Sequence, residues 1–505
     1  MSVISYAARF RQLALDDPDR PQVSDARRTW TRSELDLESD ALAHHLRDLG
    51  VAADDFVTIC LPTGGPFVRA LMACWKLGAI PQPVSSRLPA PELSAICQLA
   101  SPTAVIGAAE GMDLGATAVS AEWDPASIAL TDRSPLQDHV SPAWKAPTSG
   151  GSTGRPKLIV SGDPSLLDPD AEPILLIRRN GTLVMPGPLY HNGPLSWAAI
   201  SLLAGGHVVV FDRFDPMTTL AAIETHSADM VYLVPTMMRR IWRLAPDDRE
   251  SFDLSCLKVV WHLAEPCPAW LKDAWIEWLG PKRIWELYAG TENQASTVIR
   301  GDQWLTHRGS VGRTTVGEMI VLSASGVPVP AGIIGEIFMR RGEGIAAPYR
   351  YVGADAKTLA TDELGEGWES LGDMGWMDDE GYLYLADRAT DMILSGGANI
   401  YPAEIEAALC EHSVVESAAV IGLPDDDLGN VVHAIVQVAA TSSADANPGE
   451  LIAELLSFCG ERLVRYKVPR SMEFVTEPLR DEAGKVRRSQ LRAERLVSRG
   501  VGPSD

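Results

Sequence analysis

The run 148–157 combines hydroxyls, glycines and basic residues in the way expected of a polyphosphate-binding loop. Glycines let the backbone bend so that successive N–H groups point at one anion, while hydroxyls and Lys157 add donors and positive charge. It is not the P-loop of ATPases, because it lacks a Gly-Lys-Ser/Thr sequence and Pro156 prevents smooth entry into a helix. A flexible surface loop is the alternative interpretation. The residues predicted to contact phosphates are Thr148, Ser149, Gly150, Gly151, Ser152, Thr153, Gly154 and Lys157.

Glu292, directly after a Gly-Thr pair, has the chemistry of a metal ligand. ATP brings Mg²⁺, which prefers oxygen ligands and usually takes one or two carboxylates together with phosphate oxygens. Tyr288 offers an aromatic ring for the face of an adenine. The segment 288–292 is a weak motif alone, but in order after the loop at 148–157 it predicts a nucleotide site.

Asp373 lies in a Gly-Asp turn and is a candidate ribose ligand. An ionised carboxylate is a pure acceptor with two oxygens, so it can accept both ribose hydroxyls. Arg388 offers matching donors. The competing interpretation is that Asp373 only caps a turn, which is a common use of Gly-Asp pairs.

Taken in order, these motifs resemble the acyl-adenylate-forming enzymes, which include acyl-CoA synthetases, carrier-protein adenylation domains and firefly-type luciferases. The resemblance spans nearly the whole chain, from 30–35 to Arg488. It implies ATP with Mg²⁺, and coenzyme A as a substrate. The catalytic residues that it implies are Lys485, His191, Thr291 and Glu292, with Glu292 as the metal ligand. The further ATP or AMP contacts that it implies are Ala264, Glu265, Pro266, Tyr288, Ala289, Gly290, Asp373 and Arg388.

Lys485, judged by composition alone, is one surface cation among many. By resemblance it matches a mobile lysine that stabilises charge while an adenylate forms. A carboxylate that attacks the α-phosphate brings two anions together, so a preorganised cation between them is a large electrostatic effect. A lysine on a separate domain can also be withdrawn after this first half-reaction.

The resemblance also assigns an acyl pocket, a hinge and a passage for coenzyme A. The acyl pocket residues are His191, Trp197, Leu263, Ala289 and Gly290, although a lone histidine is more often structural. The passage is the glycine-containing loop Ser395, Gly396 and Gly397. The hinge is Thr390, at a position where the family usually has Asp or Lys, and a hinge residue need not be charged.

Apolar spacing and turn residues predict the elements that position these residues. Helices are expected at 6–15, 33–49, 66–77, 270–279, 402–409 and 448–462, and one is expected to begin near Leu195. Strands are expected at 56–61, 78–81, 104–106, 158–160, 182–185, 207–211, 230–234, 257–263 and 283–287. This alternation predicts an α/β fold with a mostly parallel sheet, whose ligands lie off the carboxyl ends of the strands.

Beyond 309 the pattern changes to short strands with Gly-Pro turns, which predicts a small antiparallel β unit up to 387. The last part mixes strands at 414–421 and 433–438 with helices, an α+β pattern. We therefore predict an N-terminal adenylation domain at 1–388, made of α/β subdomains and the β unit. A smaller, mobile α+β domain at 389–505 is predicted to carry the catalytic lysine and the coenzyme A passage.

The composition excludes several classes of protein. The 505 residues, 46% hydrophobic and 22% charged, suit a soluble globular protein of two or more domains. The net charge of −23 argues against a general nucleic-acid binder. Seven cysteines without CxxC spacing suggest core thiols in a reducing compartment. Neither a secretory signal nor an apolar run long enough to span a membrane is visible, so a cytoplasmic location is expected.

Charge is unevenly distributed, because the segment 461–499 has eleven Lys and Arg residues against six Asp and Glu residues. Coenzyme A carries a pyrophosphate and a 3′-phosphate, so a basic surface here would suit its nucleotide end. A solvated basic helix is the competing explanation.

We interpret the chain as a two-domain acyl-CoA ligase that converts a small-molecule carboxylic acid and ATP into an acyl-adenylate, and then into a thioester. By resemblance the acid is bulky and polycyclic, of the steroid or terpenoid kind, although a medium-chain or aryl acid stays open. The alternatives are a stand-alone enzyme that loads an acyl carrier protein, a luciferase-like oxygenase and a non-enzymatic binding protein. The last should have lost Lys485 or Glu292, and both are present. The oligomeric state stays open, a homodimer included.

Overall fold

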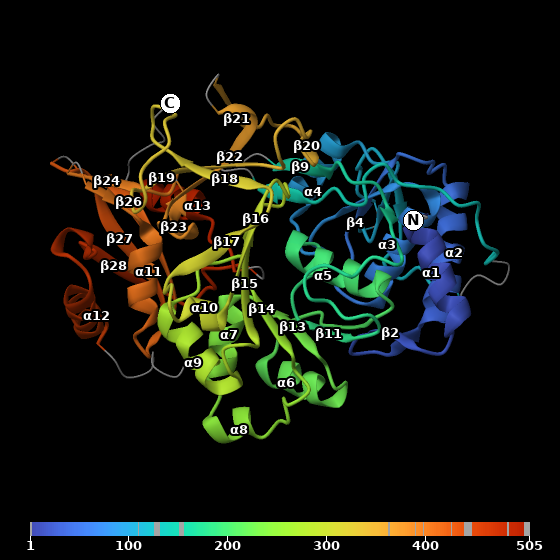
Figure 1. Cartoon of the computed structure of the whole chain (residues 1–505), viewed down its shortest axis with the longest axis horizontal. Coiled ribbons are helices and arrows are strands. Elements are labelled where there is room, and N and C mark those ends of the chain that lie inside the picture. Colours follow the sequence, from blue (N-terminus) through green and yellow to red (C-terminus); the bar gives the residue numbers. More distant parts are fainter. Residues whose placement is uncertain are drawn as a thin grey trace.

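The computed structural model describes residues 3–109, 111–125, 132–150, 156–361, 364–388, 390–396, 398–425, 427–438, 447–481 and 484–498, with positions 149, 150, 360, 361 and 388 described by their backbone. The chain forms a large N-terminal part and a smaller C-terminal part of mixed α and β structure, which confirms the predicted fold class. Figure 1 shows α1–α3 at one end of the molecule, in blue, and the orange and red C-terminal elements at the other end.

One 14-stranded sheet organises the large domain. Its parallel half has the order β15 (Ile284–Ala289), β14 (Val259–His262), β13 (Met230–Leu233), β11 (Thr182–Met185), β12 (His207–Val210) and β2 (Pro21–Ser24), with β3 (Thr29–Thr31) antiparallel at its edge. The four strands β11 to β14 are almost wholly buried, as expected of parallel strands covered on both faces, whereas β15 is only partly buried. The positions of β11 to β15 agree with the sequence-based prediction to within two residues, whereas β2 and β3 were not predicted.

The other half of this sheet is antiparallel. It continues from β15 through β16 (Ser296–Arg300), β17 (Ser310–Val316), β23 (Tyr382–Arg388), β22 (Gly365–Met377), β19 (Gly335–Arg340) and β18 (Glu318–Leu322), and β21 (Lys357–Thr361) pairs with β22. The predicted antiparallel β unit is therefore present, but it is no separate body. It extends the main sheet, because β16 pairs antiparallel with β15 on one side and with β17 on the other.

Three smaller sheets complete this domain. A parallel sheet contains β5 (Ile80–Pro83), β4 (Phe56–Ile59), β6 (Ala104–Ile106) and β7 (Thr117–Val119). An antiparallel sheet contains β20 (Tyr349–Val352), β9 (Pro156–Ser161) and β8 (Thr148–Gly150), and β1 (Ile4–Ser5) pairs with β10 (Leu166–Leu167). The assignment of the strand at 158–160 to a parallel sheet was wrong, since β9 pairs antiparallel with both neighbours. Only five residues separate β8 from β9 in the sequence, too few for the crossover that parallel pairing needs.

The helices of the large domain pack around these sheets. They are α1 (Tyr6–Asp16), α2 (Arg32–Asp48), α3 (Gly65–Leu77), α4 (Ala90–Ala100), α5 (Asn192–Leu203), α6 (Pro216–Thr225), α7 (Pro235–Trp242), α8 (Pro246–Glu250), α9 (Ala269–Leu279) and α10 (Gly301–Trp304). A capping box at Thr31 and Glu34 begins α2. Among the described residues, no helix is long and apolar enough to cross a bilayer.

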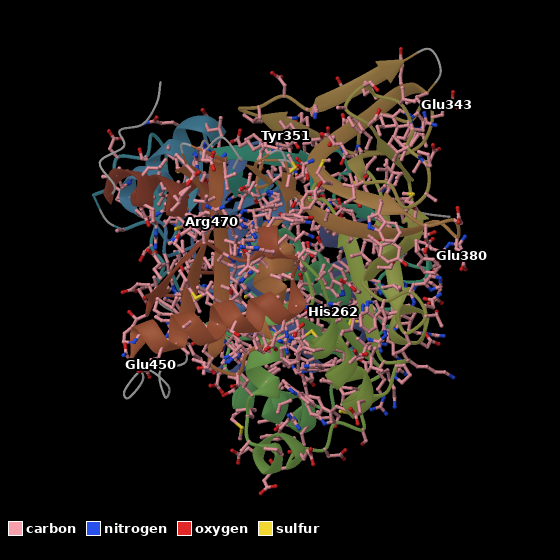
Figure 2. The ribbon with its side chains drawn as sticks, turned by 90° about the vertical axis from the view of Figure 1, so that its left-hand side faces the viewer. His262, Glu343, Tyr351, Glu380, Glu450 and Arg470 are labelled. Atoms are coloured by element: carbon pink, nitrogen blue, oxygen red, sulfur yellow. The ribbon has the colours of Figure 1, made fainter. Side chains whose placement is uncertain are left out.

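The C-terminal domain has its own hydrophobic core. Its elements are β24 (Ile393–Ser395), β25 (Ala398–Ile400), α11 (Pro402–Cys410), β26 (Val415–Asp425), β27 (Gly429–Val438), α12 (Pro448–Arg462), the 3₁₀ turn Arg465–Lys467, β28 (Ser471–Val475) and α13 (Arg488–Ser498). Buried side chains such as Leu409, Val420 and Leu455 pack among themselves and not into the core of the large domain. Figure 2 shows this domain facing the viewer, with Arg470 and Glu450 on it.

Candidate functional site

The predicted phosphate loop forms a β-hairpin. Strand β8 pairs with β9, which sets Thr148 opposite Leu158 and Ser149 opposite Lys157. The Gln82 side chain donates a hydrogen bond of 3.1 Å to the Thr148 hydroxyl and fixes its rotamer. The predicted phosphate contacts Gly151, Ser152, Thr153 and Gly154 lie outside the described residues, and Ser149 and Gly150 are described by their backbone.

The base of this hairpin meets the predicted metal ligand. Lys157 Nζ lies 3.7 Å from Glu292 Oε1, and the Tyr351 hydroxyl donates to the same carboxylate oxygen at 2.5 Å. The ammonium also lies 3.7 Å from the centroid of the Tyr351 ring. Burial, followed by the Glu292 charge, raises the pKa of Tyr351, so this residue stays a proton donor. Glu292 is 5% exposed and presents a hard oxygen site beside a basic loop.

This arrangement fits a magnesium ion that arrives with phosphates. Mg²⁺ keeps several waters and binds through one or two carboxylates plus substrate phosphates, so it needs no protein cage. Within the described ranges no group of three or more His, Cys, Asp and Glu side chains could hold a metal alone. Glu292 is the carboxylate that would hold the ion.

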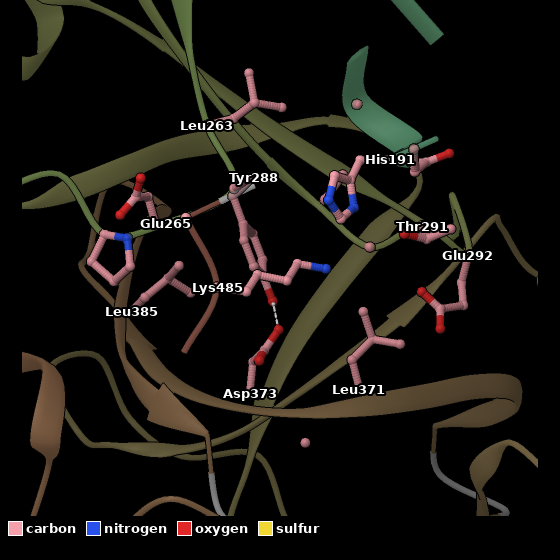
Figure 3. A pocket seen from close by; sticks show the side chains of 18 of the residues that line it. His191, Leu263, Glu265, Tyr288, Thr291, Glu292, Leu371, Asp373, Leu385 and Lys485 are labelled. Carbon is pink, nitrogen blue, oxygen red and sulfur yellow. Dashed lines mark hydrogen bonds between the residues drawn. The ribbon is translucent and has the colours of Figure 1, made fainter. Parts of the chain in front are cut away.

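A narrow turn connects the metal ligand to β15. A β-carbon at Gly290 would meet the Leu371 side chain, so a larger residue here would require that side chain to move. Ala289 ends β15, and Thr291 and Glu292 follow the turn. Figure 3 shows Thr291, Glu292 and Leu371 on one side of the pocket.

The predicted adenosine residues also come together. The Tyr288 hydroxyl donates a hydrogen bond of 2.7 Å to Asp373 Oδ2, drawn in Figure 3. Asp373 on β22 lies opposite Arg388 on β23 in the strand register. The side chain of Arg388 lies outside the described part of the chain, so its ribose role stays a prediction. One carboxylate oxygen of Asp373 is thus oriented by a protein donor.

The Glu265 side chain contacts Thr236 and Arg480, and the nucleotide contact predicted for its loop stays a prediction. Ala264 has a left-handed φ of 76°, which is uncommon for a residue with a side chain. The turn sends the Glu265 carboxylate inward, where it accepts hydrogen bonds from Thr236 N at 2.8 Å and Thr236 Oγ1 at 2.9 Å. Burial raises its pKa, although Arg480 opposes this. The carboxylate faces the C-terminal domain, so only its backbone and Pro266 are left for the predicted adenine contact.

Arg480 links this carboxylate to the loop that carries Lys485. Its guanidinium lies 3.6 Å from Glu265 Oε2, donates to Glu406 at 3.0 Å and donates to the Gly484 carbonyl at 2.9 Å. A β-carbon at Gly484 would collide with Glu265. The two domains therefore meet closely one residue before Lys485.

Lys485 reaches into the cavity of the large domain. Its backbone N–H donates to Asp481 Oδ1 at 2.9 Å, and the Asp481 N–H donates to its carbonyl at 3.0 Å, which closes the loop on itself. Figure 3 shows the side chain between His191 and the Tyr288–Asp373 pair. The C-terminal lysine and the N-terminal phosphate residues thus face one cavity, of about 3570 Å³, that both domains line.

His191 is held neutral at this meeting point. It precedes α5, and burial lowers its pKa to about 4; Lys485 lowers it further, while Asp481 opposes this. Its Nε2 has no hydrogen-bond partner among the described residues. Tyr190 packs against it with ring centroids 4.5 Å apart. A neutral imidazole beside Lys485 can donate or accept one hydrogen bond at the reacting group.

The predicted acyl pocket is rich in packed aromatic rings. Trp197 makes edge-to-face contacts with Tyr232 at 5.2 Å and with Trp261 at 5.6 Å. All three line the cavity and are less than 5% exposed. Leu263 ends the adjoining strand segment and lines the cavity too. Much of the space on this side of α5 is therefore filled by the protein itself.

The predicted hinge and passage lie at the domain boundary. Thr390 lines the cavity and follows β23, and the boundary between 388 and 389 stays a prediction. Ser395 ends β24 and Gly396 follows it, and neither residue lines the cavity in this arrangement. Gly397 lies outside the described residues.

The basic segment near the C-terminus is less basic at its surface than its composition suggests. Several of its cations are paired with carboxylates, namely Arg462 with Glu411, Lys467 with Glu404, Arg480 with Glu406, Arg488 with Asp391, and Arg495 with Glu473. Helix α13, which the sequence suggested only as an alternative, carries part of this charge. These pairs weaken the argument for a nucleotide-binding surface here.

Sequence reasoning missed three residues of the site. Tyr351 lies 59 positions from Glu292, and no local motif marks it. Arg480 precedes the Lys485 motif by five residues, a spacing that could have drawn attention to it. Lys145 precedes the phosphate hairpin and is buried, which a lysine between Trp144 and two apolar residues could have suggested.

Comparisons with known proteins agree with this geometry. The model of the AMP-binding enzyme family matches residues 10–350, and that of the AMP-binding enzyme C-terminal domain matches residues 404–485. The chain is 31% identical over 487 residues to a feruloyl-CoA synthase from Amycolatopsis sp, which covers 92% of this chain and 93% of the relative. It is 26% identical over 488 residues to a 2-succinylbenzoate–CoA ligase from Bacillus cereus, covering 95% and 97%.

Solved structures share the fold. The o-succinylbenzoate CoA synthetase from Bacillus subtilis, in complex with its acyl-adenylate intermediate, superposes with a TM-score of 0.79 at 23% identity and covers 97% of this chain and 98% of its own. The same enzyme with ATP and a magnesium ion gives a TM-score of 0.78 at 24% identity, covering 97% and 100%.

Proposed function

We infer the reaction from the premise that this chain belongs to the AMP-binding enzyme family, whose model matches residues 10–350. The chain is an AMP-forming acid–thiol ligase that uses ATP, Mg²⁺ and coenzyme A, as the sequence predicted. We propose that its first step joins a carboxylic acid to AMP. The observation that carries this proposal is the convergence of Lys485, Glu292 and the Tyr288–Asp373 pair on one cavity from two domains.

In the first step a carboxylate oxygen attacks the α-phosphorus of ATP, and the bond to the β-phosphate oxygen breaks to release pyrophosphate. The hairpin 148–157 holds the phosphates, and Asp373 accepts the ribose hydroxyls. Glu292 would hold Mg²⁺, which supplies charge neutralisation on the phosphates. Lys485 lies between the carboxylate and the α-phosphate and offsets their repulsion. Neutral His191 orients the carboxylate without a charge of its own.

In the second step residues 389–505 rotate about Thr390 and withdraw Lys485. The Ser395–Gly397 loop then lines a passage for the pantetheine thiol. The thiol, as its thiolate, attacks the acyl carbon and AMP leaves, which gives the thioester. The separate hydrophobic core of the C-terminal domain supports this rotation, because relative motion is the default for domains that do not share a large hydrophobic interface.

The identity of the acid is part of the proposal. Flat aromatic walls at Trp197, Tyr232 and Trp261 suit a ring-containing acid. The names of the relatives, a feruloyl-CoA synthase and a 2-succinylbenzoate–CoA ligase, favour an aryl acid. A polycyclic steroid or terpenoid acid, our sequence-based expectation, has no counterpart in the names of these relatives.

The acceptor and the setting are proposed as follows. Coenzyme A is the thiol, and a carrier protein is the alternative acceptor that the experiment below tests. The oligomeric state stays open, a homodimer included. The cysteines at 60, 74, 97, 256, 267, 410 and 459 are all free thiols, which supports the expected cytoplasmic location.

The test is pyrophosphate release across a panel of fatty, aryl and polycyclic acids, with and without coenzyme A. We expect release with an aryl acid, and a thioester only when coenzyme A is added. Release without any thioester would move the second step to a carrier protein. Absence of pyrophosphate release with every acid of the panel would contradict the proposed ligase reaction on these acids.

A further inference from the structure

Lys145 is a buried cation that the proposed reaction does not use. It is 7% exposed, although lysines are almost never buried unless they are paired with an opposite charge. Its ammonium donates to Asn192 Oδ1 and, at 3.0 Å, to Ser196 Oγ, and lies 4.2 Å from the centroid of the Trp144 ring. All these partners are electrically neutral.

The other buried lysines of the described chain show what is different. Lys76 lies 2.7 Å from Asp36 and 2.9 Å from Asp40, and Lys272 forms an ion pair with Glu286. Each of these two charges is therefore neutralised where it is buried. No described carboxylate lies within ion-pair distance of Lys145. Its ammonium donates hydrogen bonds to neutral groups, but no opposite charge neutralises it at that distance.

The charges that face Lys145 act only through space. Burial lowers its pKa to about 7, and the more distant Asp163 and Glu292 oppose this shift. Asp163 is exposed to solvent, and Glu292 already accepts from Tyr351 and neighbours Lys157. An anion next to the ammonium would recover part of the desolvation cost and keep the lysine charged.

The start of α5 favours an anion at the same place. Asn192 and Ser196, which accept from Lys145, lie in the first two turns of this helix. Its N-terminus carries partial positive charge, and no side chain caps it. The ammonium therefore sits against the positive end of a helix dipole, an arrangement that only a negative ligand turns from unfavourable to favourable.

The cavity leads from the reacting groups to this point. Ser196, Ile200 and Leu203 share one face of α5, because residues three and four apart lie on the same side of a helix. All three line the cavity together with Lys145 and Tyr6. Trp197 lines the same cavity from a neighbouring side of α5, so an acyl ring that contacts this aromatic wall can extend along α5 toward Lys145.

We propose that Lys145 binds a second anionic oxygen of the acid, a carboxylate or a phenolate, and so selects acids that carry one besides the reacting carboxylate. This rests on the proposed function, since it names the substrate class of the same site. Asn192 and Ser196 hold the ammonium in place, and the apolar face of α5 contacts the carbon skeleton. The same chemistry could come from the pyrophosphate end of ATP, and the test below separates the two sources.

The experiment measures pyrophosphate release with three matched acids: 3-phenylpropanoate, 3-(4-hydroxyphenyl)propanoate and 3-(4-carboxyphenyl)propanoate. The wild-type protein should prefer the carboxyphenyl acid over the phenyl acid by about 10- to 100-fold in kcat/KM, mainly through KM. Lys145→Met should reduce this ratio about tenfold or more, while Lys282→Met, at an exposed lysine away from the cavity, should keep it. Equal turnover of all three acids by the wild type would overturn the proposal while leaving the ligase reaction established.

A binding measurement covers the case in which Lys145→Met folds poorly. Ser196→Ala keeps the lysine but frees its ammonium, and should weaken the carboxyphenyl acid more than the phenyl acid in a thermal-shift titration without ATP. Inhibition by inorganic pyrophosphate should be the same in wild type and Lys145→Met. If pyrophosphate inhibition weakens instead and the preference among acids persists, the anion at Lys145 is a phosphate and the proposal is wrong. Absence of pyrophosphate release with every acid would contradict the proposed function itself.

Discussion

Lys157 and Lys485 face the same cavity, but the protein holds them in different ways. Lys157 is part of β9, which is hydrogen-bonded to β8 on one side and to β20 on the other. Lys485 lies on a loop whose contacts with the large domain include the Arg480–Glu265 and Arg487–Glu92 pairs. The first lysine is fixed in a sheet, and the second is docked.

The contacts around each lysine sharpen this difference. Glu292 and Tyr351, which meet Lys157, belong to the same domain as it does. Around Lys485, most of the charge pairs lie within the C-terminal domain, as in Arg488 with Glu406. A group needed throughout the reaction can sit on a strand, whereas one needed in only one step benefits from a docking that can be undone.

The largest effect is expected from Lys485→Ala. Without the cation, the carboxylate and the α-phosphate repel each other, so pyrophosphate release should fall by about 10²- to 10³-fold. Arg470→Ala removes an exposed charge from the same domain and serves as the matched control. If Lys485→Ala keeps pyrophosphate release within threefold of the wild type, the docked lysine has no role in adenylation.

Glu292→Gln tests the fixed half of the site. The substitution keeps the shape but removes the charge, so the Mg²⁺ concentration for half-maximal turnover should rise by about 10- to 100-fold. Tyr351→Phe removes one hydrogen bond to the carboxylate. This variant should raise the Mg²⁺ concentration for half-maximal turnover by roughly tenfold or less. A magnesium titration that is unchanged in Glu292→Gln would rule out this ligand.

Glu265→Gln tests the docking itself. Loss of the charge that faces Arg480 should loosen the arrangement that presents Lys485 and slow adenylation by roughly tenfold. Thioester formation from pre-made acyl-AMP should not slow, because that step needs the other arrangement. Glu92→Gln is the control, since the Arg487–Glu92 pair is exposed and 3.9 Å apart, and an effect below twofold is expected. Equal slowing of both half-reactions by Glu265→Gln would make it a purely structural residue.

His191 is expected to change the pH dependence of stability and not the rate of a half-reaction. Its pKa of about 4 in the folded protein lies below the usual 6.5, so between these values the unfolded chain binds more protons. Stability is therefore complete above pH 6.5 and falls as the pH drops toward 4, by about 2 kcal/mol at pH 5. His191→Asn should remove this contribution to the loss of folding stability at low pH. The measurement compares urea unfolding midpoints at pH 5.0 and 7.5. An identical loss in the variant would mean that the histidine is not held neutral.

The sequence predicted the parallel half of the sheet well because its strands are buried on both faces and read as short apolar runs, as at 207–211 and 230–234. It predicted Glu292 and Asp373 because each lies in a short motif next to a glycine. It could not predict that the β unit continues the main sheet, since that depends on the pairing of β16 with β17.

The contacts that the sequence missed join residues far apart in the chain. Tyr351 meets Glu292 only because β20 pairs with β9, and Glu265 meets Arg480 only because two domains dock. The motif around Glu265 suggested a nucleotide contact, and nothing in its local composition showed that the left-handed turn at Ala264 would send the carboxylate toward the other domain.

The most direct test of the docked lysine is thioester formation from pre-made acyl-AMP and coenzyme A, compared between the wild type and Lys485→Ala. If Lys485 acts only while docked at the phosphates, the variant forms the thioester at the wild-type rate although its pyrophosphate release is lost. If both half-reactions are lost to the same extent, Lys485 serves the fold or both steps, and the contrast between a fixed and a docked half of the site is wrong.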